Sequence, residues 1–169
     1  GVLSFQDPLS GTVTVGTGGT YTTFNGPLGL FYALNTRGLN GNLTVEVISD
    51  VNENVAYQPL GVIPEYCGTG YSVLIRPSQA VVRQITQSTG SSPMIALIGA
   101  KRVTFDGAYN GTSNYFLFRQ SQNTPVFFFN GVASGATEDI TIKNSTIEGN
   151  SQATTGFGPG TISFAGVGG

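Results

Sequence analysis

Few residues in this chain could take part in catalysis or metal binding, and histidine, which serves both purposes most often, is missing. The 169 residues include no His and a single Cys, Cys67. The absence of His excludes a Ser-His-Asp triad and nearly all types of zinc site. A single Cys cannot form an intrachain disulfide. Acid–base chemistry would therefore depend on the nine Asp and Glu residues.

Two aspartates, Asp106 and Asp139, lie next to segments of similar pattern. Asp106 follows its predicted strand, whereas Asp139 precedes its own. We therefore expect them at different corners of the fold, and a glycosidase needs two carboxylates that flank one bond. The sequence favours a non-catalytic protein, and we predict no catalytic residue.

The densest group of candidate metal ligands is Asp50, Asn52 and Glu53. Carboxylate and amide oxygens suit calcium, but neither a twelve-residue calcium loop nor a calcium-binding nonapeptide repeat surrounds them. We expect no cofactor, and these three residues are the weak candidates if calcium does bind.

Charge and hydropathy exclude some partners. Charged residues make up 9% of the chain, and seven basic residues give a net charge of -2. Nucleic acid would require a basic patch, so we expect no nucleic acid partner. The longest apolar runs, such as residues 126–129, are too short to cross a bilayer, so we expect no membrane insertion.

Aromatic residues cluster in the middle of the chain. In an alternating strand Phe127 and Phe129 share one face and Phe128 lies on the other. We assign the first two to the core. Phe128 and Tyr109 are the candidates for contact with a glycan or a protein.

One helix is predicted, over residues 25–38. Asn25 is a plausible N-cap, Pro27 fits the first turn and Gly38 fits the C-terminal cap. Its apolar stripe could cover the first rung of the strands that follow.

The remaining chain consists of short β-branched or aromatic segments separated by Gly, Asn and Pro. The predicted strands are residues 11–16, 42–48, 71–76, 81–86, 94–98, 102–105, 115–119, 125–129, 139–142 and 161–164. Similar segments recur 37 residues apart at Val103 and Ile140, and 32 and 35 residues apart at Ile95, Phe127 and Ile162. This spacing predicts an all-β, right-handed parallel β-helix, a solenoid with a short amino-terminal capping helix. An antiparallel sandwich with coincidental spacing is the alternative.

Two regions follow from this prediction. Residues 1–41 would form an amino-terminal strand and the capping helix, and residues 42–169 would form the coils. The chain begins with Gly1 and ends just after a strand. We expect a processed or trimmed product whose coils continue in a longer parent protein, or whose last coil pairs with another chain.

Residues 11–21, 41–47, 98–107 and 139–150 resemble the coil pattern of right-handed parallel β-helix proteins that Bacteroidetes secrete. The resemblance covers about residues 11–166. It implies a secreted or cell-surface location and export by the type IX system, although no carboxyl-terminal sorting domain is recognisable.

The sequence thus favours a non-catalytic extracellular scaffold, adhesin or filament subunit. Its partners would be other protein chains, paired end to end or edge to edge, or surface glycans. A polysaccharide-binding or polysaccharide-cleaving β-helix and a phage tail-fibre segment are the alternatives.

Overall fold

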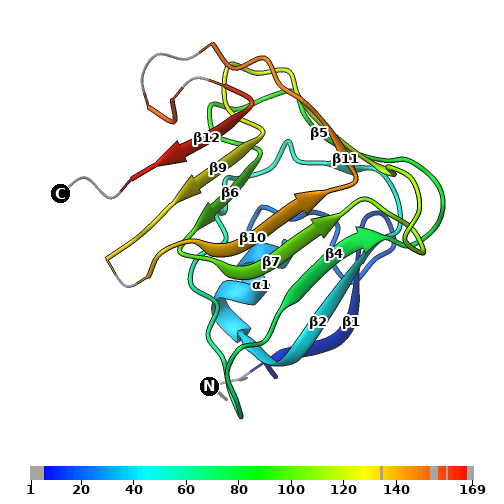
Figure 1. Ribbon diagram of the computed structural model, residues 1–169, viewed down its shortest axis with the longest axis vertical. Coiled ribbons are helices and arrows are strands. Elements are labelled where there is room, and N and C mark those ends of the chain that lie inside the picture. Colours follow the sequence, from blue (N-terminus) through cyan, green and yellow to red (C-terminus); the bar gives the residue numbers. More distant parts are fainter. Residues whose placement is uncertain (1–5, 134, 153–155, 159, 167–169) are drawn as a thin grey trace.

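A computed structural model describes residues 6–133, 135–152, 156–158 and 160–166. Its strands form three parallel sheets (Figure 1). Sheet A contains β1 (Leu9–Val15), β2 (Leu39–Val47), β4 (Val73–Pro77), β7 (Lys101–Asp106) and β10 (Glu138–Lys143). Sheet B contains β3 (Val51–Asn52), β5 (Arg83–Gln87), β8 (Phe116–Gln120) and β11 (Ser145–Glu148), and sheet C contains β6 (Ile95–Ile98), β9 (Phe127–Asn130) and β12 (Ile162–Ala165).

The chain visits sheets A, B and C in turn and returns to each sheet one coil further along. Its strand pairs keep the spacing that the sequence predicts, because Val103 pairs with Ile140, Ile95 with Phe127, and Phe127 with Ile162. The prediction of an all-β parallel β-helix is therefore confirmed. The chain-order colours of Figure 1 show the strands stacked from β1 to β10 in sheet A.

The core lies between the three sheets and receives side chains from each of them. Phe105 of β7, Phe118 of β8 and Phe127 of β9 are fully buried, with ring centroids 4.9 to 5.9 Å apart. Edge-to-face contacts of this kind add to the stabilisation that burial alone provides. Alternation along each strand directs these residues inward, as predicted for Phe127 and Phe129.

Helix α1 (Leu30–Arg37) packs its apolar residues against the amino-terminal end of this core. Leu30, Phe31, Ala33 and Leu34 are buried. Gly38 ends the helix at a φ of 67° and donates its N–H to Leu34 O at 3.0 Å. No helix in the described part of the chain is long and apolar enough to span a membrane.

The side chain of Asn35 connects α1 to sheet C. Its Nδ2 donates to Pro59 O and its Oδ1 accepts from Gly61 N, at 2.8 and 2.9 Å. These two residues flank Leu60, which pairs with Leu97 of β6. The helix therefore takes the place of a sheet C strand in the first coil, and Asn35 satisfies backbone groups that a strand would have bonded.

The predicted start of the helix is wrong. The helix begins at Leu30, after a turn in which Gly26 has a φ of 83°, and Gly29 is its N-cap. Asn25 caps no helix. Its side chain is buried, and Nδ2 donates to Glu53 Oε2 and to Met94 O. A polar side chain with distant partners cannot be distinguished from an N-cap by its local sequence.

Gly107 is required by a close approach between coils. Gly107 directly follows β7, and it is not among the residues with positive φ. A Cβ at Gly107 would lie 1.8 Å from the carbonyl oxygen of Asn144 in the next coil. The Gly107 N–H also donates to Lys143 O at 3.0 Å. The absence of a side chain allows the coils to meet here.

Candidate functional site

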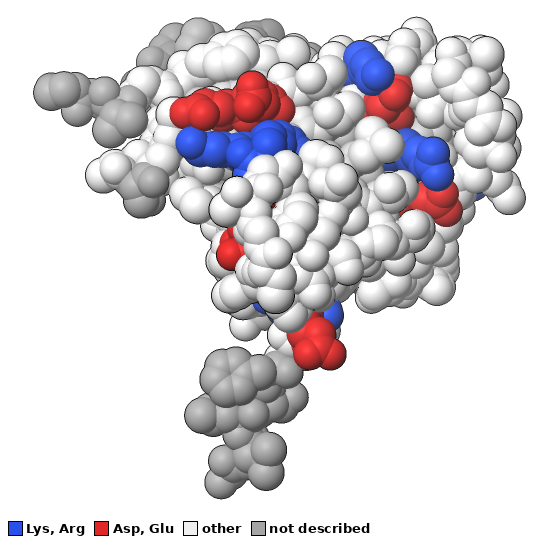
Figure 2. All heavy atoms as spheres, turned by 60° about the horizontal axis from the view of Figure 1, so that its bottom comes forward, with Lys and Arg blue, Asp and Glu red and all other residues white. Residues whose placement is uncertain are grey.

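Charged side chains in the solenoid connect one coil to the next. Each of the five ion pairs found among the described residues joins neighbouring coils, with N···O distances of 2.6 to 3.1 Å. The pairs are Glu46–Arg76, Glu65–Arg102, Lys101–Glu138, Asp106–Lys143 and Arg119–Glu148. Figure 2 shows side chains of opposite sign lying side by side on one face, separated by uncharged surface.

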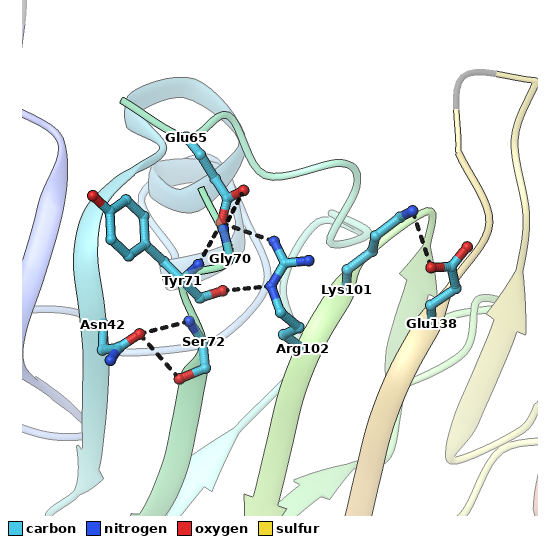
Figure 3. Close-up of polar contacts among 8 residues, drawn as sticks. All are labelled: Asn42, Glu65, Gly70, Tyr71, Ser72, Lys101, Arg102 and Glu138. Carbon is cyan, nitrogen blue, oxygen red and sulfur yellow. Dashed lines mark hydrogen bonds and ion pairs between the residues drawn. The ribbon is translucent and has the colours of Figure 1, made fainter. Parts of the chain in front are cut away.

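Two of these pairs lie where the strands of sheet A begin, and we call this region the charged corner: Glu65, Tyr71, Lys101, Arg102 and Glu138 (Figure 3). Glu65 stacks on Leu39 through a parallel bridge, and Lys101 pairs in register with Glu138. Since successive coils place equivalent residues above one another, charges distant in sequence meet here.

The Glu65 carboxylate organises the loop that precedes β4. It accepts hydrogen bonds from Gly70 N, Tyr71 N and Arg102 Nη2 at 3.1, 2.7 and 2.8 Å. Partial desolvation acts to raise the pKa of Glu65, but these hydrogen bonds and the Arg102 charge outweigh it, so the pKa lies below its usual value. The carboxylate therefore stays ionised and is already bonded.

Arg102 occupies a backbone conformation that is uncommon for a residue with a side chain. Its φ is 56°, and the equivalent residue of the next coil, Asp139, has a φ of 54°. Arg102 Nε donates to Tyr71 O at 2.9 Å, while Nη2 reaches Glu65. In this conformation the guanidinium reaches across the coil boundary, and these contacts offset the cost of the positive φ.

A cavity of about 260 Å³ opens beside these residues. Its wall combines apolar groups with Glu65, Tyr71, Lys101 and Arg102. An aromatic ring next to fixed donors and acceptors is an arrangement that can bind a small polar molecule such as a sugar unit. Acid–base catalysis fits less well, because Glu65 and Glu138 are both held in ion pairs.

Comparison with protein-family models, with curated proteins and with solved structures found no match.

The three candidate calcium ligands do not converge on one point. The Asp50 Oδ1 accepts from Gln84 N, and the Asn52 Oδ1 accepts from Asn54 N. Glu53 points inward and accepts hydrogen bonds from Phe24 and Asn25. Among the residues that the structure describes, no group of three or more His, Cys, Asp or Glu side chains could hold a metal ion.

Asp106 and Asp139 lie at opposite ends of their strands, as the sequence predicts. Asp106 pairs with Lys143 and accepts from Asn144 Nδ2 at 2.8 Å. Desolvation opposes ionisation of Asp106, but hydrogen bonds from Asn144, Ala108 and Lys143 prevail and lower its pKa. The two aspartates form no acid–base pair. Cys67 is exposed.

The assignment of Phe128 to the exposed surface is wrong. Its side chain is only 5% exposed, because Phe157 covers it with ring centroids 5.1 Å apart. Phe128 does point away from the core, but the ring of Phe157, which follows β11 in the chain, packs against it. Tyr109 is half-buried and forms an antiparallel bridge with Thr112.

The charged corner was missed by reasoning from sequence, although a signal for it exists. Glu65 and Arg102 are 37 residues apart, the same spacing as the paired strand residues Val103 and Ile140. A search for opposite charges at the coil period would have identified this pair. Local motifs cannot reveal it.

Proposed function

We propose that this chain is a non-catalytic β-solenoid with a structural or adhesive role outside the cell, as a surface scaffold, adhesin or filament subunit. The observation that carries the proposal is that each of the five ion pairs in the described chain joins neighbouring coils. Resemblance to secreted β-helix proteins supports the extracellular location. The partners in this role are other protein chains or surface glycans.

The carboxylates support a structural role because most are already bonded. Five belong to the ion pairs between coils, and Asp50 and Glu53 accept hydrogen bonds from backbone N–H groups. A general acid or base must exchange its proton with a substrate during the reaction. Carboxylates fixed in this way serve better as links between coils.

A turnover assay tests this proposal. The purified chain would be incubated with a panel of uronate and neutral polysaccharides, with or without added calcium, and new reducing ends would be measured. We expect no turnover of any polymer. Turnover that disappears in Glu65→Gln, but persists in Glu46→Gln, would contradict the proposal and place catalysis at the charged corner.

Glycan binding without cleavage is a second candidate function, and the cavity at the charged corner favours it. Tyr71 offers a ring, and the side chains of Lys101 and Arg102, which are both in ion pairs, offer N–H groups that could bond to sugar hydroxyls. A glycan array would identify ligands. Loss of binding in Tyr71→Ala, with binding retained in Tyr109→Ala, is the expected result if this cavity is the site.

A further inference from the structure

The carboxyl-terminal end of the solenoid presents three strand edges without a partner in the described chain. β10, β11 and β12 are each the last strand of their sheet. At the opposite end α1 and Asn35 occupy the sheet C position. An open edge exposes backbone groups that pair readily with another strand.

Apolar side chains lie at the same end. Phe164 is 77% exposed and stacks on Phe129, and Ile162 is 40% exposed. With Ile140 and Ile142 they line a depression of about 350 Å³. In earlier coils the equivalent positions are fully buried, as at Val103 and Phe105. The last coil therefore exposes the interior of the core.

The backbone of β10 fixes which groups are available. Lys143 O accepts from Gly107 N, so Lys143 directs its backbone groups toward β7. Since the direction alternates along a strand, Ile142 and Ile140 direct theirs to the open edge. These two residues also direct their side chains into the core. A partner strand must match both features.

We propose that this end binds a second copy of the chain, related by a two-fold axis that passes Thr141. β10 then pairs antiparallel with its copy, Ile140 lies opposite Ile142, and these two residues exchange backbone hydrogen bonds. In this register the inward side chains of both copies meet in one core. In this arrangement β11 of each copy faces β12 of the other copy. The inference rests on the scaffold role proposed above and specifies its partner.

The charged residues of β10 support a second copy of the chain as the partner. With Thr141 on the axis, Lys143 lies opposite Asp139 of the second copy, and the reverse pair forms as well. Asp139 has no ion-pair partner among the described residues, and it lies exposed at the start of β10. Lys143 is about half exposed and forms an ion pair with Asp106 of its own chain. In the dimer its ammonium group would lie between Asp106 and Asp139 of the second copy. Self-pairing therefore places two opposite charges on each side of the axis.

Sedimentation equilibrium of the 169-residue chain tests the proposal. We expect a species of twice the 17.6 kDa of one chain. Asp139→Lys would oppose two lysines at each pair, and we expect it to weaken the dimer by at least about tenfold. Asp7→Lys makes the same change in net charge far from this end and should leave the dimer unchanged. Circular dichroism would confirm that each variant is folded.

A mixing experiment tests the register itself. Lys143→Glu alone would place Glu opposite Asp139 and weaken its own dimer. Mixed with Asp139→Lys, it would restore opposite charges at both pairs, so a heterodimer should form where neither variant pairs with itself. A wild-type monomer at all concentrations up to about 100 µM would overturn the proposal. A dimer that resists Asp139→Lys, or variants that fail to complement, would overturn it as well. None of these outcomes bears on the polysaccharide assay, so the scaffold role stands or fails separately.

Discussion

The side-chain nitrogen of Asn25 donates a 2.7 Å hydrogen bond to Glu53 Oε2, and both side chains are buried. Glu53 also accepts from the backbone N–H groups of Phe24 and Asn25, at 2.8 and 3.0 Å. No cation in the part of the chain that the structure describes forms an ion pair with this carboxylate. One buried acid, directly after β3, thus holds the segment before α1 in place.

Glu53 should make the stability of the protein depend on pH. Burial raises the pKa of its carboxyl above the usual 4.5, and the three hydrogen bonds only partly oppose this. Between pH 4.5 and the raised value the folded state holds more protons than the unfolded state. The free energy of unfolding should therefore fall as the pH rises through this range. Urea unfolding at a series of pH values would measure the fall.

The matched variants are Glu53→Gln and Glu46→Gln. Glu53→Gln should abolish this part of the pH dependence and, because its amide nitrogen would face N–H donors, should cost about 1–3 kcal/mol. Glu46→Gln breaks the partly exposed ion pair with Arg76, and its free energy of unfolding should depend on pH as in the wild type. If the free energy of unfolding of Glu53→Gln still falls with pH as in the wild type, another group causes the pH dependence.

Asn35 should be needed to close the first coil. Asn35→Ala leaves Pro59 O and Gly61 N without their partner, and we expect a loss of about 1–3 kcal/mol in the free energy of unfolding. Asn35→Asp can still accept from Gly61 but cannot donate to Pro59, so its loss should be intermediate. Asn40→Ala, at an exposed position, is the control. Equal stability of Asn35→Ala and Asn40→Ala would show that the helix closes the coil by apolar packing alone.

Gly107→Ala should separate two coils. The new Cβ would overlap the carbonyl oxygen of Asn144, which is backbone and cannot rotate away. We expect a loss of at least about 2 kcal/mol, visible as a lower melting temperature. A Cβ at Gly166 would meet no atom of the described residues within 4 Å, so Gly166→Ala should be nearly neutral. If both variants melt alike, the close approach at Gly107 is relieved by a small shift of the chain.

Glu65→Gln should loosen the loop between Glu65 and Tyr71. The ionised carboxylate holds Gly70 N and Tyr71 N, and we expect their amide hydrogen exchange to rise by about tenfold in the variant. Because the pKa of Glu65 is lowered, the wild-type protection should be complete above pH 4.5 and should be lost as the pH falls through the lowered value. Exchange measured by NMR would resolve these two amides, and Val103 in the core should exchange slowly in both proteins.

The strands could be predicted because their signals are local. β-branched and aromatic residues alternate with polar ones, and the coil spacing at Val103 and Ile140 fixes a register that the structure confirms. The two-residue strand β3 carries no such signal. The burial of Glu53 depends on Phe24 and Asn25, which lie 29 and 28 residues earlier. The sequence around Glu53 does not indicate contacts with residues so far away in the chain.

The side-chain bonds of Asn35 give the stack of coils a polarity. A strand cannot be added to sheet C at the helix end, because α1 already occupies that place. Further β-structure can join sheet C only beyond β12. Sheet C therefore has one closed end and one receptive end, and any assembly that extends this sheet must join it at the receptive end.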